Sequence, residues 1–222
     1  MVDIKDNTVP AENQMINSSD LRFLGDKNAP LKILVVGNSI TIHGPNTEIG
    51  WLGDWGMAAS SIENDYVHKL FKKLKQDGKD VYMRIRQCAF WERNYIYDNV
   101  LSNYDYERDF NADIVIFRLG ENINEKDIPL FKEALEKFIN HICPNGKVLF
   151  TTCFWERTRL DNDILEFANS RGETCINCCF SKDDKNMALG QFEHSGVAMP
   201  PNDNGMEAIA QAIFNGLKPY FN

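Results

Sequence analysis

The chain has 222 residues, 43% of them hydrophobic and 25% charged, so it has the size and apolar content of one folded domain. Its formal net charge is -8 and it has no stripe of basic residues to neutralise a phosphate backbone, so we expect no nucleic-acid partner. No apolar run is long enough to cross a bilayer, and no membrane span is expected.

Residues 1–30 are polar and irregular and end at Asn28-Ala29-Pro30, directly before the first apolar run. We expect them to form an N-terminal extension on the surface of a single domain that covers residues 31–222. The segment from Met1 to Asn17 lacks the apolar core of a secretory leader, which fits a cytoplasmic protein or an exported one whose leader has been removed. The compartment and the oligomeric state stay open.

Short apolar runs predict strands, and amphipathic patterns predict helices between them. The first helix is expected to begin at a capping box, Ser60-Ser61-Ile62-Glu63, and to end at Asp77-Gly78. This alternation predicts a three-layer α/β/α sandwich with a mostly parallel sheet of about five strands. The expected strands are 31–36, 80–86, 113–119, 147–153 and 174–178, and further helices are expected at 127–142 and 204–217.

Six cysteines are present, and Cys175, Cys178 and Cys179 include a Cys-x-x-Cys spacing. A zinc site needs a second ligand pair, which the chain lacks at the usual spacing, so no metal is expected. The other cysteines fall at the ends of predicted strands or helices, where thiols are usually buried.

The first predicted strand ends in Gly37-Asn38-Ser39-Ile40, and the third ends in Arg118-Leu119-Gly120-Glu121-Asn122. In parallel sheets, ligands bind beyond the carboxyl ends of the strands, so Ser39 and Asn122 are expected at the same edge. A serine on a tight turn after a buried strand is one way to present a nucleophile for acyl transfer. The alternative is that Ser39 only forms the turn.

These two segments and Pro201-Asn202-Asp203-Asn204-Gly205-Met206 stand in the order and spacing of the SGNH (GDSL-type) hydrolases, which the chain resembles from Leu31 to Leu217. The resemblance implies a flavodoxin-like fold without metal or cofactor. It implies that Ser39 is the nucleophile and that its backbone amide and the side chain of Asn122 donate to the oxyanion. Ile123 replaces the aspartate that often follows, which leaves that donor in place.

Two parts of the chain depart from the family pattern. The second block, Gln87 to Arg93, has no glycine, so the backbone amide of Ala89 or Phe90 is expected to supply the remaining oxyanion donor. In the last block, Pro200 stands where the catalytic histidine should be, and Val197 stands where its aspartate should be.

The missing histidine leaves four others to consider. His194 lies six residues before Pro200 and is the candidate substitute base, while His43 is expected to line the pocket. His68 and His141 fall within helix patterns and are read as ordinary helix residues. Either His194 has taken over the role, or the site lacks an efficient base.

The tetrapeptide Phe-Trp-Glu-Arg occurs at Phe90–Arg93 and again at Phe154–Arg157, each time just after a predicted strand. Trp91 and Trp155 are candidate stacking walls, and the charged residues beside them are candidate polar contacts to a sugar or carboxylate: Glu92, Arg93, Glu156 and Arg157. The alternative is a pair of buried aromatic side chains with surface ion pairs. The loop Gly50–Met57 is either a pocket rim or a packing loop. The residues expected to contact substrate are Asn38, His43, Trp91, Glu92, Glu121 and Trp155.

The sequence thus predicts a serine ester hydrolase acting on short acyl esters, including those of carbohydrates. The alternative is a degenerate member of the fold that binds a glycan or another small molecule without turnover, because Pro200 cannot accept a proton. A flavin or nucleotide binder is disfavoured, since the first loop has no glycine-rich phosphate cradle.

Overall fold

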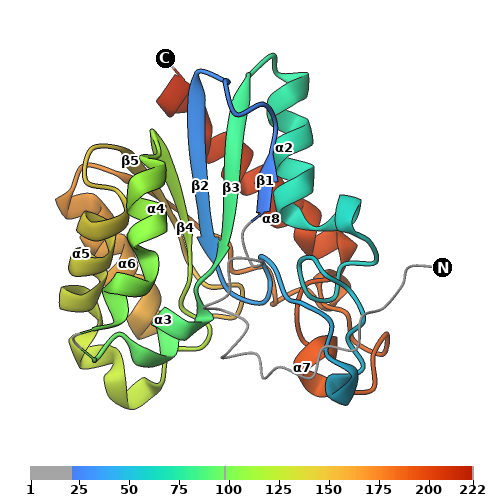
Figure 1. The fold of residues 1–222 in the computed structure, drawn as a ribbon. Coiled ribbons are helices and arrows are strands. Elements are labelled where there is room, and N and C mark those ends of the chain that lie inside the picture. Colours follow the sequence, from blue (N-terminus) through green and yellow to red (C-terminus); the bar gives the residue numbers. More distant parts are fainter. Residues whose placement is uncertain (1–21, 98, 222) are drawn as a thin grey trace.

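The computed structural model describes residues 22–97 and 99–221, which form a mostly parallel sheet with helices on both faces (Figure 1). Within the described residues the sheet has six strands in the order β1-β3-β2-β4-β5-β6. β1 pairs antiparallel with β3, and all other pairs are parallel. The strands are β1 (Arg22–Leu24), β2 (Leu31–Gly37), β3 (Val81–Gln87), β4 (Ile114–Arg118), β5 (Lys147–Thr151) and β6 (Thr174–Ile176).

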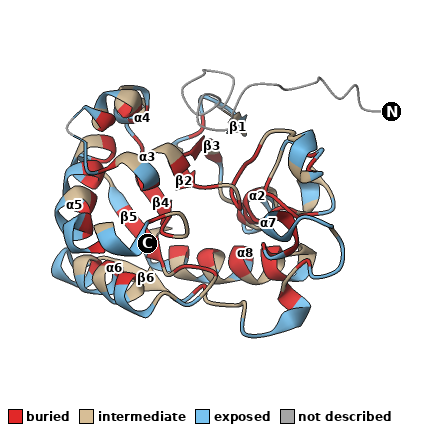
Figure 2. Cartoon of the chain, turned by 90° about the horizontal axis from the view of Figure 1, so that it is seen from below, coloured by how far each residue is buried: buried red, intermediate tan, exposed pale blue. Residues whose placement is uncertain are grey.

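Two groups of helices cover the two faces. α2 and α8 pack together on one face, and α3 to α6 cover the other. Figure 2 looks at the molecule from below and shows the buried strands between α5 and α6 on one side and α2 and α8 on the other. The helices are α2 (Tyr66–Gln76), α3 (Ala89–Asn94), α4 (Asp105–Phe110), α5 (Phe131–Ile142), α6 (Thr158–Ser170), α7 (Ser195–Ala198) and α8 (Asp203–Leu217).

The central strands are apolar at nearly every position because both of their faces are buried. On β2, Ile33 and Val35 pack toward α2 and α8, whereas Leu34 and Val36 belong to the core under α3 to α6. Successive side chains of a strand point to opposite faces, so a strand between two helical layers needs an uninterrupted apolar run. The predicted three-layer architecture is confirmed, with one strand more than the expected count.

The additional strand lies in the segment expected to be a surface extension. Arg22, Phe23 and Leu24 pair with the middle of β3, and the Phe23 ring stacks on Tyr82 with centroids 5.3 Å apart. Three residues are too few to show a strand pattern in the sequence. This segment is a strand because it pairs with β3. Residues 1–21 of the expected extension lie outside the described residues.

The capping box predicted for the first helix is wrong. Residues 62–64 form a 3₁₀ turn, and α2 begins at Tyr66 with Asp65 as its N-cap, which accepts from the His68 N–H at 2.8 Å. The Ser60 hydroxyl instead donates to Asp203 at 2.6 Å, at the start of α8. Asp65 is held in place by a tertiary contact, a 3.3 Å hydrogen bond from the Gly56 N–H, and that contact decides where the helix begins.

The carboxyl ends of the parallel strands meet at the lower edge of the molecule in Figure 1, where α3 begins directly after β3. The Cys88 N–H donates to Gly37 O at 2.6 Å, which ties the end of β2 to the start of α3. Among the helices that the structure describes, none has both the length and the apolar character needed to cross a membrane.

A buried ion cluster joins β3 to α4. The Arg84 guanidinium lies 2.7 Å from Glu107, and the Arg86 Nε lies 3.6 Å from it, with all of these side chains almost completely buried. Removing one partner of a buried pair leaves an uncompensated charge. We therefore expect Glu107→Gln to lower the free energy of unfolding by about 3–5 kcal/mol in urea titrations.

Asp109→Asn is the matched control for this prediction, because it removes an exposed carboxylate that pairs with Arg108 on the same helix. Its expected cost is below about 1 kcal/mol. Equal shifts of the urea midpoint in the two variants would contradict the stabilising role of the buried Glu107 carboxylate.

Candidate active site

Ser39 sits on a single helical turn at the end of β2. The N–H groups of Thr41 and Ile42 both donate to Asn38 O, at 2.9 and 3.1 Å. The turn requires a glycine before it, because a Cβ atom on Gly37 would lie 1.7 Å from Thr41 Oγ1. Ser39 is half-buried, and no hydrogen bond from another described residue engages its hydroxyl or its backbone N–H. The turn therefore presents both groups that a nucleophilic serine uses.

Asn38 lies buried beneath this turn with its whole side chain engaged. Its Nδ2 donates to Glu121 at 2.6 Å and to Glu92 at 3.2 Å. Its Oδ1 accepts from the Ile40 N–H and from Arg118, at 3.2 and 3.3 Å. These bonds engage the Asn38 side chain within the protein, and they fix the serine turn.

Glu92, on α3, holds the loop that follows β4. Its Oε1 accepts from the Gly120 N–H at 2.5 Å, and its Oε2 accepts from Asn122 Nδ2 at 2.6 Å. Gly120 has a φ of +145°, and a Cβ atom there would lie 2.5 Å from the Cys153 sulfur, so this position requires glycine. One buried carboxylate thus sets the orientation of the Asn122 amide.

A second carboxylate, Glu121, completes the buried cluster. It accepts from Arg118 at 2.6 Å and from the Phe154 N–H at 2.9 Å. Burial and the neighbouring charge of Glu121 raise the pKa of Glu92, while the donors on Asn122, Gly120 and Asn38 oppose the rise. The cluster gives the site a buried floor with many hydrogen bonds, in which Arg118 Nε has no partner among the described residues.

Arg118 was not among the site residues singled out from the sequence, whereas Arg93 was a candidate polar contact. Arg118 is completely buried at the end of β4, and Arg93 Nη2 donates to Asn122 Oδ1 at 3.4 Å. A signal existed for Arg118, because a cation that ends an apolar strand needs a buried partner, and Glu121 stands three residues later. The signal for Arg93 was its place at the end of the first Phe-Trp-Glu-Arg segment.

The two Phe-Trp-Glu-Arg segments have different surroundings. The first copy lies in α3, where Trp91 is completely buried and stacks on Phe138 with ring centroids 4.4 Å apart. Trp91 has no surface for a ligand, in keeping with the alternative of a buried aromatic side chain. In the second copy Trp155 is half-buried, and Glu156 is exposed and pairs with Lys182 at 2.8 Å.

Arg157 of the second copy supports the loop after β4. Its guanidinium donates to Gly120 O at 2.7 Å and to Ile123 O at 2.6 Å. The loop that carries Asn122 is therefore held from both copies of the tetrapeptide, by a carboxylate from one and a guanidinium from the other.

Of the two backbone amides expected as the remaining oxyanion donor, the one on Ala89 is already engaged. The Ala89 N–H donates to the Gln87 side chain at 3.0 Å. Ala89 is almost completely buried at the start of α3. Its amide would have to leave Gln87 before it could reach an oxyanion, so Ser39 and Asn122 are the better placed donors.

His194 lies exposed at the N-cap of α7, where its Nδ1 accepts from the Gly196 N–H at 3.1 Å. An accepting Nδ1 places the proton of the neutral ring on Nε2, which is then a donor and not a base. Pro200 is buried, and its carbonyl accepts from the Ala188 N–H at 3.0 Å. Val197 is completely buried and packs with Trp51.

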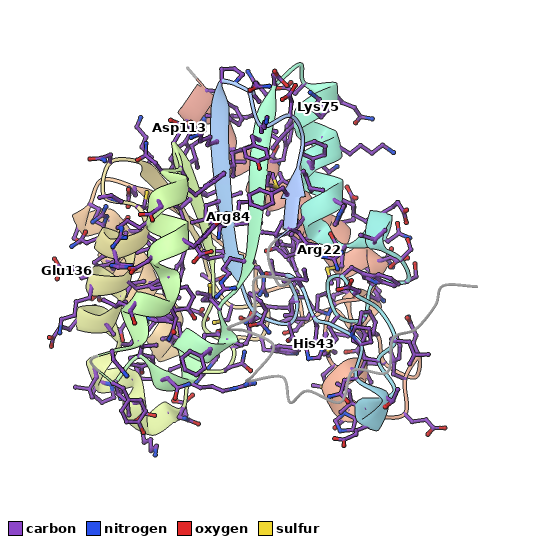
Figure 3. All side chains as sticks on the ribbon, in the orientation of Figure 1. Arg22, His43, Lys75, Arg84, Asp113 and Glu136 are labelled. Atoms are coloured by element: carbon purple, nitrogen blue, oxygen red, sulfur yellow. The ribbon has the colours of Figure 1, made fainter. Side chains whose placement is uncertain are left out.

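The loop Gly50–Met57 packs rather than standing open as a rim. Trp51 is almost fully buried between Trp55 and Phe192, with ring centroids 5.7 and 6.1 Å away. The Trp55 indole donates to Ala59 O at 2.9 Å. This loop supports His43, which is 9% exposed and lies at the carboxyl edge of the sheet, at the opposite end from Asp113 (Figure 3).

The described part of the chain therefore gathers Ser39, the Asn122 amide and a buried carboxylate cluster at the carboxyl edge of an α/β/α sheet. This is the fold of the SGNH/GDSL-type hydrolases. No family model matches the sequence, and no curated protein matches it.

Solved structures match over most of the chain. A variant of an acetyl xylan esterase from Geobacillus stearothermophilus aligns with a TM-score of 0.58 at 15% identity, over 86% of this chain and 95% of that one. An alpha/beta hydrolase enzyme from the metagenome of Lake Arreo, Spain, gives 0.58 at 16% identity, over 85% and 95%. A G-D-S-L family lipolytic protein from Desulfitobacterium hafniense gives 0.51 at 14% identity, over 84% and 99%. At these identities the likeness concerns the fold.

Proposed function

We propose that this protein is a serine ester hydrolase. The observation that carries the proposal is that no other described residue engages the hydroxyl or N–H of Ser39, which lies at the same sheet edge as an Asn122 amide fixed by Glu92. The esterases among the solved structures of this fold support it.

In the proposed reaction, Ser39 Oγ attacks the ester carbonyl carbon and the carbonyl oxygen becomes an oxyanion. The Ser39 N–H and Asn122 Nδ2 donate to that oxygen. Asn122 Nδ2 carries two hydrogens, and since only one is needed for the bond to Glu92, the other remains for the oxyanion. One such donor contributes roughly 10²–10³ in kcat.

We infer short acyl esters of carbohydrates as the substrate class. Several solved structures of this fold are named as acetyl xylan esterases. The loop after β4 is held by Glu92 and Arg157 and leaves Arg93 exposed beside Asn122, which offers a polar contact to a sugar hydroxyl.

A second candidate function is ligand binding without turnover. Pro200 favours it, because proline stands where the resemblance places the catalytic base and its ring has no proton acceptor. In that case the fixed Asn122 amide and Arg93 would bind an acetylated glycan without cleaving it.

The test is acylation of the protein by p-nitrophenyl acetate. We expect rapid release of p-nitrophenol followed by slower turnover, and an acetyl group on the peptide that contains Ser39 in mass spectra of acid-quenched protein. The proposed hydrolase function would be rejected if p-nitrophenol were released without turnover and Ser39 carried no acetyl group. Acetylated xylooligosaccharides, offered beside long-chain esters, report the substrate class through the acetate released.

A further inference from the structure

The position that the resemblance assigns to the base carries no proton acceptor, yet a serine nucleophile needs a group that takes its proton. We propose that His43 is this base and that its Nε2 accepts the proton of the Ser39 hydroxyl. The inference rests on the proposed ester hydrolysis and gives His43 a role in the chemistry rather than in lining the pocket.

One helical turn separates Ser39 from His43. The turn is closed by the bond from the Ile42 N–H to Asn38 O at 3.1 Å. Cα atoms three residues apart in a helix are about 5 Å apart, and one further residue adds at most about 3.8 Å. The Cα atoms of Ser39 and His43 therefore lie within about 9 Å, a gap that a serine and a histidine side chain together can close.

Both residues are also bound to the same short segment of the neighbouring loop. The Met57 N–H donates to Ser39 O at 2.9 Å, and the His43 N–H donates to Trp55 O at 3.0 Å. The Trp51 indole adds a bond to His43 O at 3.1 Å. The buried loop thus fixes the backbone of His43 beside the backbone of Ser39, which is the preorganisation that a base requires.

The ring of His43 is held in the form that a base needs. Its Nδ1 lies 2.6 Å from Gly44 O, and because a carbonyl only accepts, Nδ1 carries the hydrogen. The lone pair of the neutral ring is then on Nε2, which has no hydrogen-bond partner among the described residues. A carboxylate does the same work for the histidine of a Ser-His-Asp triad.

The electrostatics keep this ring neutral and connect it to the oxyanion side of the site. Burial is the main cause that lowers the pKa of His43; the hydrogen bond to Gly44 opposes this, and the charge of Arg93 lowers the pKa further. Arg93 in turn bonds Asn122 Oδ1 at 3.4 Å. Glu48 lies in the 3₁₀ turn Thr47–Ile49 before the packed loop, and Asp54 within the loop forms an ion pair with Arg22.

The proposed reaction is an ordinary acyl transfer in two halves. Nε2 takes the Ser39 proton while Oγ bonds to the carbonyl carbon, and the imidazolium returns that proton to the alcohol oxygen as its bond to carbon breaks. In the second half, Nε2 takes a proton from water as the water oxygen bonds to the acyl carbon, and Ser39 leaves with the proton from the ring.

The test compares His43→Asn with the unmodified protein in hydrolysis of p-nitrophenyl acetate. An asparagine side chain can keep a donor toward Gly44 O and removes Nε2, so the fold is retained while the base is lost. We expect kcat to fall on the order of 10³-fold and added imidazole to restore part of the rate in His43→Ala. His141→Gln, on α5, is the matched control and should keep the rate.

The pH dependence of the rate distinguishes a base from a residue that only supports the fold. Since the pKa of His43 lies below 6.5, activity of the unmodified protein should persist to pH values below 6.5 before it falls, and this limb should be absent in His43→Asn. If His43→Asn kept full activity while Ser39→Ala lost it, the role of His43 as the base would be overturned and the proposed ester hydrolysis would stand. If activity were lost in His194→Ala and kept in His43→Asn, His194 and not His43 would be the base. If the unmodified protein shows no turnover above Ser39→Ala, the proposed function fails and the role of His43 fails with it.

Discussion

Ser39→Ala is expected to reduce kcat for p-nitrophenyl acetate and for acetylated sugars by about 10⁴-fold, with KM nearly unchanged. The substitution removes the one atom that forms the covalent intermediate and leaves the floor of the site intact. No described residue bonds to the Ser39 hydroxyl, so the free energy of unfolding should change by no more than about 0.5 kcal/mol. Steady-state kinetics and urea unfolding of the same preparation measure both effects.

Ser170→Ala is the control for that prediction. Ser170 ends α6, away from the carboxyl edge, and its hydroxyl donates to Phe167 O at 2.7 Å. Its removal should leave kcat unchanged. Hydrolysis that survives Ser39→Ala at the original rate would show that another group performs the chemistry.

Glu92→Gln is expected to lower both stability and activity, although the side chain keeps its size. Donors from Asn38, Gly120 and Asn122 converge on the carboxylate, and an amide would turn an N–H toward one of them. We expect the free energy of unfolding to fall by about 3 kcal/mol, as when a buried polar group loses its partner. The Asn122 amide would lose its fixed orientation, and kcat should fall roughly 10²-fold.

Glu156→Gln supplies the matched stability control, because Glu156 occupies the same place in the second Phe-Trp-Glu-Arg segment. It is exposed and pairs with Lys182 on the surface, so the expected cost is below about 1 kcal/mol. If Glu92→Gln were as stable as Glu156→Gln, the buried carboxylate would not be what orders the loop after β4.

The fold was predictable where a local pattern is strong and tertiary contacts agree with it. The apolar runs that became β2 and β4 must be buried on both faces, and this alone requires helices on each side of a parallel sheet. The same topology placed Ser39 and Asn122 at one edge. The capping box at Ser60 failed because several residues nearby could cap a helix, and the bond from Gly56 selected Asp65.

The sequence by itself determined the architecture, the position of the serine turn and the departure at Pro200. Only the tertiary structure decided what identical or similar residues do. The two Phe-Trp-Glu-Arg segments are the same locally, but the first is helical and buries its carboxylate under Asn122, and the second exposes it. His43 and His194 differ in the same way: a carbonyl beside one ring and an N–H beside the other set opposite tautomers, and neither partner can be read from the side chain alone.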